Sequence, residues 1–348
     1  MQTTAGSKLI GEVGEFGLIA GLSNILDSSR VRSTGMVLGA GDDSALWQPR
    51  PGRQVAITVD TLVEGIHFRH DWIDAESLGH RALAVNLSDL AAMGARPRVA
   101  VVSLGLRGTE SDRWVYDLYR GLVALGQRCH TRIIGGDIVS SPAAATISVT
   151  AHGEVRPGRA LRRDQAQPLD IVAVTGPLGL AAAGVRILTA GTLRVDGAPA
   201  MLRAHRTPQP RVLHGLLLAA AGVRAAMDLS DGLLGDLPKL CAASNVSVLL
   251  DEDSLPTPRS VRWGFDDWQE LALRGGEDFE LLFSADPETF ERVQLLFRRF
   301  KLAPPIAIGK LSRPKDDGPK VTMRRTDQRR VELQPGAYDH FKAHSLPR

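Results

Sequence analysis

This sequence has few cysteines, few aromatic residues and no long apolar run. Its two cysteines, Cys129 and Cys241, are far apart among 348 residues, a spacing typical of neither a disulfide framework nor a zinc site. Aromatic residues make up 5% of the chain, and no stretch combines them with basic residues as a nucleic-acid groove does. No apolar run reaches the ~18 residues that a membrane-spanning helix needs. We therefore expect no nucleic-acid partner and no membrane association.

Charge of one sign is not in large excess either. The chain has 42 Lys and Arg against 39 Asp and Glu, and its pI is near 9.0. This is mild basicity without a long basic run, so it does not indicate a nucleic-acid surface. The first residues do not show a charged segment followed by an apolar one, as a secretory signal does. Together with the few cysteines, this favours a cytoplasmic location. The length is sufficient for two domains.

One carboxylate lies where isolated charge is unusual. Residues 86–94 read Asn-Leu-Ser-Asp-Leu-Ala-Ala-Met-Gly, and we expect them to end a helix that begins near Asp74 and stops at Gly94. Asp89 is the only charged residue in that stretch. A carboxylate in such an apolar helix is usually paired with Arg or Lys, or else it binds a metal.

The first half of the chain carries three further acids at turns or strand ends. Asp43 lies in a glycine-rich turn at residues 39–45, where an acid is commonly only a turn cap. The β-branched run at residues 54–59 predicts a strand that ends at Asp60. A second strand, at residues 132–134, runs directly into Gly-Gly-Asp, which ends at Asp137. Acids at strand ends often line ligand sites.

The other expected elements of this half form a mixed β-α-β arrangement. The apolar spacing predicts a helix over residues 15–26, and Ser111 is a candidate N-cap for a helix that runs toward Cys129. Strands are expected at residues 99–106 and 144–149. The basic segment at residues 156–163, with its proline and glycine, is the best linker candidate. We therefore expect one domain at residues 1–160 and another at residues 161–348.

The second half places more acids beside glycines. A strand at residues 170–175 opens this half, and Asp228 and Asp231 precede a helix that ends near Asn245. If their turn were helical, the two carboxylates would share a face. Two glycines precede Glu277, just before a strand at residues 279–284.

Taken together, the acids indicate a cation site. None has an obvious basic partner nearby in the sequence, and six of the same character favour function over structure. Oxygen ligands without Cys or paired His favour Mg²⁺. Because Mg²⁺ held by few carboxylates usually also binds phosphate oxygens, a nucleotide is implied. Walker and protein-kinase motifs are missing. The six are Asp43, Asp60, Asp89, Asp137, Asp228 and Asp231.

At this point the sequence resembles the thiamine-monophosphate kinase family, part of the aminoimidazole-ribonucleotide-synthetase-like superfamily. The matching motifs occur in the order of the family from residue 14 to residue 341. Each motif alone is weak evidence for the family, but together they are strong evidence. They are GEF at 14–16, GDD at 41–43, DTLV at 60–63, GIHF at 65–68, NLSDLAAMG at 86–94, GGD at 135–137, DLSDG at 228–232, GGEDFEL at 275–281 and YDHF at 338–341.

The resemblance implies a fold and an activity. The fold would be a two-domain α/β protein with mixed sheets. Its N-terminal domain would bind ATP and Mg²⁺ and pair with its copy in a homodimer, and its C-terminal α/β domain would complete the site. The activity would be ATP-dependent phosphorylation of thiamine monophosphate to thiamine diphosphate, the last step of thiamine diphosphate biosynthesis, by direct in-line transfer assisted by several Mg²⁺ ions. No residue would act as a covalent nucleophile.

The resemblance also assigns residues to roles. Metal ligands would be Asp43, Thr58, the backbone carbonyl of Val59, Asp60, Asp89, Asp137, Asp228 and Asp231. ATP contacts would be Tyr119, Gly136, Asp137, Arg163 and Ser230, with Tyr119 near the adenine. Contacts with thiamine monophosphate would be His67, Glu277 and the tail residue Tyr338. Taken alone, a lone histidine such as His67 is more often structural.

Three kinds of alternative stay open. One is another ATP-dependent synthetase of the same superfamily. Selenophosphate synthetase commonly has a Cys or selenocysteine with a Lys in an N-terminal glycine-rich loop, and the hydrogenase-maturation dehydratase needs a C-terminal cysteine; neither feature is present. The second is a metal-dependent phosphodiesterase, which also uses clustered aspartates. The third is a nucleotide sensor without catalytic activity, which would bind ATP but form no ADP.

Overall fold

The structure, a computed structural model, describes residues 7–32, 35–191, 194–315 and 318–336. The chain divides into two compact units. Unit 1 comprises Met1–Leu90 and Ala95–Pro157, and unit 2 comprises Ala91–Gly94 and Gly158–Arg348. In the described ranges, no helix is both long enough and apolar enough to cross a membrane.

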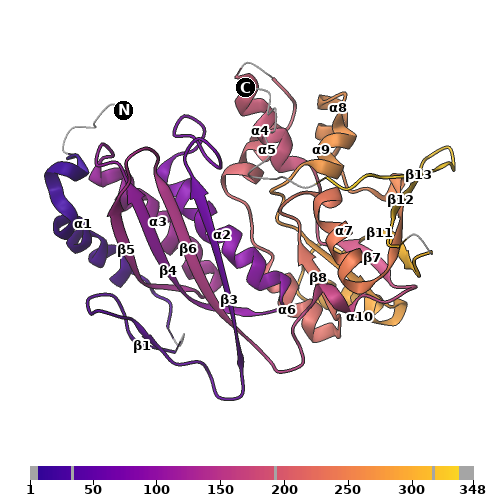
Figure 1. Cartoon of the computed structure of the whole chain (residues 1–348), viewed down its shortest axis with the longest axis horizontal. Helices are drawn as coiled ribbons and strands as arrows, with labels where there is room; N and C mark the ends of the chain where they lie inside the picture. The colour runs from indigo at the N-terminus through magenta and orange to yellow at the C-terminus, as the bar shows by residue number, and fades with distance from the viewer. Residues whose placement is uncertain (1–6, 33–34, 192–193, 316–317, 337–348) are drawn as a thin grey trace. The chain divides into compact units, whose positions relative to one another are not determined.

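Unit 1 is built on a four-stranded mixed sheet with the strand order β3-β6-β4-β5. Strands β4 and β5 are parallel, whereas β6 is antiparallel to both of its neighbours. Figure 1 shows this sheet with α2 and α3 along it. The elements are α1 (Ile10–Asp27), β1 (Met36–Leu38), β2 (Leu46–Trp47), β3 (Gln54–Val63), α2 (Ala75–Ala92), β4 (Arg96–Leu106), α3 (Asp112–Cys129), β5 (Arg132–Ser140) and β6 (Thr146–Val155).

Helices α2 and α3 approach each other closely through glycine. A Cβ at Gly79 of α2 would lie 1.8 Å from the carbonyl oxygen of Leu118, and one at Gly121 of α3 would lie 1.9 Å from that of Glu76. Any larger residue would push the helices apart. Ser111 caps α3 as predicted, because its hydroxyl accepts a hydrogen bond of 3.1 Å from the backbone N–H of Trp114.

The two faces of the sheet of unit 1 differ. Along β3, alternate residues are partly or fully buried, and this set includes Thr58, Asp60 and Leu62. The residues between them point to the other face. There Val55, Ile57 and Val59 are 41%, 65% and 59% exposed. An apolar strand face is thus left open in the single chain.

Unit 2 has a seven-stranded sheet in the order β13-β12-β9-β11-β7-β10-β8. All pairs are antiparallel except β12 with β9. The strands are β7 (Ile171–Val174), β8 (Ala225–Asp228), β9 (Ser247–Asp251), β10 (Leu281–Ala285), β11 (Ile306–Ser312), β12 (Val321–Arg324) and β13 (Arg330–Glu332). The helices are α4 (Leu180–Ala190), α5 (Ala198–Arg206), α6 (Val212–Ala221), α7 (Leu233–Ser244), α8 (Arg259–Gly264), α9 (Trp268–Arg274) and α10 (Pro287–Arg299), with short 3₁₀ turns η1 (Arg163–Gln165) and η2 (Glu252–Ser254).

Helices cover both faces of this second sheet. One core cluster joins Val172 and Leu282 of the sheet to Leu237 of α7. A second cluster joins Phe283, the residue that follows Leu282 in β10, to α6 and to Phe297 of α10. Because neighbouring strand residues point to opposite faces, unit 2 is an α/β/α sandwich. The mixed α/β fold expected from the sequence is confirmed.

Three local predictions are corrected, and one open condition is settled. Helix α1 begins at Ile10 and contains a non-helical Gly14, so the first helix starts earlier than residue 15. Asp60 and Asp137 lie inside strands β3 and β5 rather than at strand ends, because pairing with β6 and β4 continues past them. Asp228 is the last residue of β8, and the turn after it is not helical. Asp228 and Asp231 therefore share no helix face.

Candidate functional site

Three oxygen-bearing side chains meet where β3 faces α2. The hydroxyl of Thr58 donates a hydrogen bond to Oδ2 of Asp89. Asp60 follows two residues later on the same face of β3, and its pKa responds to the charge of Asp89. The predicted strand and the predicted helix thus bring Thr58, Asp60 and Asp89 together.

Asp60 is the perturbed member of this cluster. Burial, and then the negative charge of Asp89, raise its pKa to about 7. Among the residues that the structure describes, no hydrogen bond or ion pair is recorded for the Asp60 carboxylate. Two carboxylates this close oppose each other's ionisation, and a bound proton or cation would relieve that repulsion.

Asp137 lies elsewhere on the same sheet. By register it shares a row with Ser103, Ser148 and Thr61, which is the row next to that of Asp60. Since successive rows point to opposite faces, Asp137 projects from the face opposite to Asp60. Two strands, β6 and β4, separate them, which places the backbones about 14 Å apart at ~4.8 Å per strand.

The remaining candidates of unit 1 lie in local contacts or in the core of this unit. The backbone N–H of Asp43 donates to Oδ1 of Asp42 at 2.8 Å, so the carboxylate that binds the turn here is that of Asp42 and not that of Asp43. Nδ1 of His67 accepts a hydrogen bond of 3.1 Å from the N–H of Val63. A Cβ at Gly136 would lie 2.0 Å from the carbonyl oxygen of Val102, so the glycine permits close strand pairing. Tyr119 is only 3% exposed, and burial raises the pKa of its hydroxyl.

In unit 2 the loop after β8 is fixed by a residue that sequence reasoning missed. Asp236, in the first turn of α7 and 1% exposed, accepts hydrogen bonds from the N–H groups of Ser230 and Asp231 at 2.9 and 2.8 Å. Burial raises its pKa, and Lys239 opposes that effect. The signal available was an acid in the first helical turn, which is also common in helices without a site.

The expectation that no candidate acid has a nearby basic partner is wrong for Asp231. Nζ of Lys239 lies 2.5 Å from Oδ2 of Asp231 and 2.8 Å from Oδ1 of Asp236. The lysine follows one helical turn after Asp236, so the pair forms as soon as α7 does. Asp228 is 4% exposed at the end of β8.

Glu277 is held against the same loop. Its N–H donates to the carbonyl oxygen of Ser230 at 2.9 Å, and one carboxylate oxygen lies 3.3 Å from Nδ1 of His205. The next acid, Asp278, has a different role: it accepts hydrogen bonds from the N–H groups of Gly179 and Ala181 at 2.6 and 3.0 Å. It therefore caps α4.

The other two ATP candidates of unit 2 are exposed. Arg163 lies in η1 and Ser230 in the loop after β8, and the side chains of both reach solvent. Tyr338 lies outside the described residues. In the described parts of the chain, no three His, Cys, Asp or Glu side chains form a group arranged to hold a metal ion. The cluster of unit 1 provides two carboxylates and a hydroxyl.

Comparison with known proteins decides the family. Residues 41–155 match the AIR synthase related protein N-terminal domain, and residues 167–321 match the corresponding C-terminal domain. The thiamine-monophosphate kinase of Bacillus subtilis (strain 168) is 35% identical over 308 residues, which is 88% of this chain and 94% of that protein. The chain belongs to the thiamine-monophosphate kinase family.

Solved structures of the family have the same fold. The crystal structure of the thiamine-monophosphate kinase from Stenotrophomonas maltophilia K279a is 39% identical, with a TM-score of 0.78 over 86% of this chain and 95% of that chain. The structure of AaThiL complexed with AMPPCP and TMP is 28% identical, with a TM-score of 0.72 over 97% of this chain and 100% of that chain. The family resemblance inferred from the motifs is confirmed.

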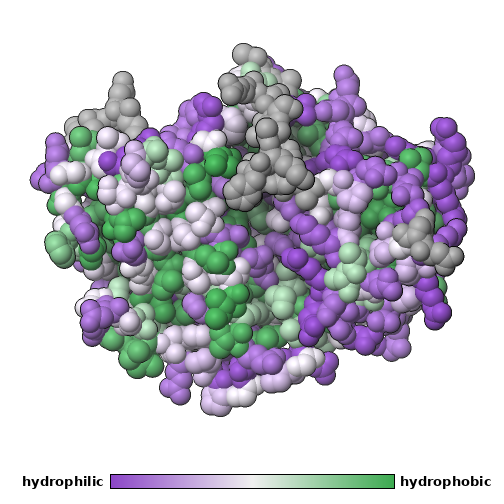
Figure 2. Space-filling model, in the orientation of Figure 1, coloured by the Kyte–Doolittle hydropathy of each residue, from purple (hydrophilic) through white to green (hydrophobic). Residues whose placement is uncertain are grey.

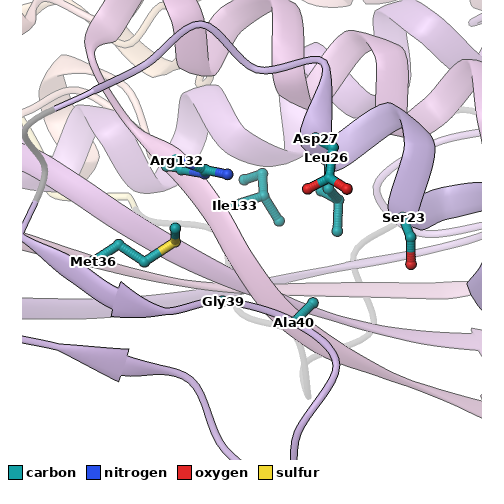
Figure 3. Close-up of a pocket in the computed structure, with 8 residues that line it drawn as sticks. All are labelled: Ser23, Leu26, Asp27, Met36, Gly39, Ala40, Arg132 and Ile133. Atoms are coloured by element: carbon teal, nitrogen blue, oxygen red, sulfur yellow. The ribbon is translucent and has the colours of Figure 1, made fainter.

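A small cavity lies beside the loop that leads to Asp43. It has a volume of about 170 Å³ and is lined by residues of α1, β1, the loop and β5. Figure 3 shows the side chains of Arg132 and Asp27 pointing toward the same space. None of the residues assigned by the family resemblance lines it. The lining residues are Ser23, Leu26, Asp27, Met36, Gly39, Ala40, Arg132 and Ile133.

Proposed function

We propose that this chain transfers the γ-phosphoryl group of ATP to the phosphate of thiamine monophosphate, giving thiamine diphosphate and ADP. The observation that carries the proposal is the 35% identity to a thiamine-monophosphate kinase along 94% of that enzyme. The related structure with an ATP analogue and TMP supports the same pair of substrates. The enzyme is thus a phosphotransferase of thiamine biosynthesis.

The chemistry of the acceptor explains the character of the site. A phosphate monoester has a second pKa near ~6, so the acceptor is already an anion at neutral pH and needs no strong general base. The obstacle is repulsion between two polyanions and the charge of a loose transition state. Positioning and charge neutralisation are therefore what the protein must supply, without a covalent nucleophile.

We propose that Mg²⁺ is held by the oxygen ligands of unit 1. Thr58, Asp60 and Asp89 fit this ion, because they present only oxygen atoms. Burial and then the charge of Asp89 raise the pKa of Asp60 to about 7, and a bound cation would favour its ionised form. The carbonyl of Val59 and the carboxylate of Asp43 would add to this set. When bound, Mg²⁺ would neutralise phosphate charge and polarise the leaving oxygen.

The unit 2 residues would act on the phosphates. We propose that Arg163 clamps a phosphate as a charged donor, that the exposed Ser230 contacts ATP, and that Asp228 and Asp231 hold further Mg²⁺. Lys239 already forms an ion pair with Asp231. A metal bound there would either displace the lysine ammonium group or share the Asp231 carboxylate with it. Glu277 and His67 would contact the acceptor. A contact of Tyr119 with adenine stays a prediction, as does that of Tyr338 with a thiamine ring.

We also propose that the chain is a homodimer through the open face of the sheet in unit 1. Figure 2 shows apolar residues gathered over the strands of this unit. The exposed side chains Val55, Ile57 and Val59 lie on that face, and Asp137 projects from it by register. Because one Mg²⁺ cannot bridge about 14 Å, Asp137 and Asp60 of one chain cannot share an ion, and we propose that Asp137 holds a different Mg²⁺ from the one at Asp60.

These assignments give each domain a proposed role. The N-terminal domain would bind ATP and Mg²⁺ and dimerise, and the C-terminal domain would complete the site. We propose a cytoplasmic location, which the two free cysteine thiols favour.

An acceptor screen tests the proposed function. Formation of ADP is measured with ATP and Mg²⁺ alone, with thiamine, and with thiamine monophosphate. We expect ADP only with thiamine monophosphate, in a one-to-one ratio with thiamine diphosphate. ADP formed at the same rate without an acceptor would refute the kinase, and cleavage of a phosphodiester without ATP would indicate the phosphodiesterase alternative.

A further inference from the structure

The backbone at Glu277 is held in an unusual conformation. Its φ of 70° lies in the left-handed region, which few residues other than glycine adopt. The N–H of Glu277 donates to the carbonyl oxygen of Ser230 at 2.9 Å. At the preceding Gly276 a Cβ would lie only 2.5 Å from that same oxygen. The main chain of Glu277 is therefore fixed against the loop after β8.

The side chain of Glu277 is fixed from the other side by a buried histidine. Nδ1 of His205 lies 3.3 Å from Oε2 of Glu277, with His205 3% and Glu277 32% exposed. His205 belongs to the last turn of α5, which packs on α4 so closely that a Cβ at Gly184 would lie 2.3 Å from the carbonyl oxygen of Met201. The imidazole therefore sits on a rigid support, while part of the carboxylate reaches solvent.

We propose that His205 is a positioning residue that aims the Glu277 carboxylate at the cationic ring of the acceptor. The inference rests on the proposed function, in which the acceptor is a thiazolium cation and Glu277 contacts it. A glutamate side chain has several rotamers. The 3.3 Å contact with the buried imidazole selects one of them before the acceptor arrives. A side chain that is already ordered in this way binds its ligand more tightly, because less conformational entropy is lost on binding.

The inference predicts an effect on one substrate only. Without the imidazole, Glu277 must be ordered by the acceptor itself, so the KM for thiamine monophosphate rises while the KM for ATP does not. Hydrogen bonds to charged groups are worth about ten-fold or more in an equilibrium constant. We expect a KM for thiamine monophosphate at least ~10-fold higher in His205→Phe.

The variants are chosen to separate positioning from stability. His205→Phe keeps a buried ring but cannot donate, whereas His205→Gln keeps a donor and should restore most of the affinity. His214→Phe is the matched control, since His214 is another buried histidine of unit 2, stacked edge-on with Phe297 5.1 Å away. Thermal unfolding is recorded for every variant.

The experiment measures KM and kcat for both substrates in each variant. A selective rise in KM for thiamine monophosphate in His205→Phe, absent in His214→Phe and reduced in His205→Gln, supports the inference. In Glu277→Gln the further change His205→Phe should then add little. Equal changes in both KM values, or none, overturn it. Should His205→Phe not fold, His205→Gln against His205→Ala gives the same comparison. Failure of the wild type to use thiamine monophosphate overturns the proposed function instead.

Discussion

Asp60 and Asp278 are both partly buried acids with a raised pKa, but their surroundings differ. In both residues burial raises the pKa to about 7. Asp278 is compensated by the N–H groups that begin α4, and helix capping explains why it is retained. Asp60 has the charge of Asp89 beside it instead. A cost in stability without structural compensation is typical of a functional site.

His214 carries a pH dependence that can be measured. Burial, followed by the charge of Arg211, lowers its pKa from 6.5 to about 4. Between these two pH values the unfolded chain binds more protons, so the free energy of unfolding rises with pH through this window. The full effect is about 3 kcal/mol at 1.36 kcal/mol per pKa unit.

Urea unfolding at several pH values between 4 and 7 checks this prediction. The neutral variant His214→Gln should lose that part of the slope, and the difference between the two proteins removes the contribution of all other groups. Parallel curves for the wild type and His214→Gln would contradict it.

The glycine pair before β10 illustrates how one element constrains another. A Cβ at Gly276 would meet the carbonyl oxygen of Ser230 at 2.5 Å, and one at Gly275 would meet that of Leu271 at 2.2 Å. Gly276 is therefore required because the loop after β8 passes within contact distance, and Gly275 because it lies against the end of α9.

Gly276→Ala should displace the loop that carries Ser230 and Asp231. We expect a loss of roughly 1–3 kcal/mol in the free energy of unfolding from overpacking, together with at least a ~10-fold lower kcat/KM from displaced contacts. Gly11→Ala is the control, because its nearest neighbour is an ordinary 3.5 Å away. Wild-type kinetics in Gly276→Ala would show that this loop does not position the substrates.

The elements were predictable where one local signal dominated. The Ser111 cap, the stop at Gly94 and the apolar run of β7 are such cases. Strands β3 and β5 are longer than predicted, because Asp and Gly are poor strand residues and only pairing with β6 and β4 keeps Asp60 and Asp137 extended.

Within the site, residue types were informative but partners were not. Thr58, Asp60 and Asp89 meet as their motifs indicate. Asp236 and His205 escaped notice, because their partners are fixed only when a loop or another helix folds against them. The same holds for Lys239, whose contact with Asp231 depends on the path of the turn before α7.

At the scale of the whole molecule, the open face of β3 predicts association. Ile57→Lys places a charge in the centre of this face, where Ile57 is 65% exposed. We expect a dimer for the wild type and a monomer for Ile57→Lys by light scattering, since an interface core tolerates no unpaired charge. Activity should fall with the dimer if the homodimer is the working form of the enzyme.

Leu295→Lys gives the matched control for this change. Leu295 is 59% exposed on α10, in unit 2, and the proposed interface does not include it. A wild-type protein that is monomeric and active would exclude the homodimer as the working form.

The account depends most on the carboxylates between β3 and α2, and Asp89→Asn tests them directly. This change keeps the shape of the side chain but removes the charge that would hold Mg²⁺. The measurement is the rate of ADP formation with saturating ATP, Mg²⁺ and thiamine monophosphate, alongside thermal unfolding. We predict a loss of about 10³-fold or more with the fold retained. A wild-type rate in Asp89→Asn would contradict the central claim.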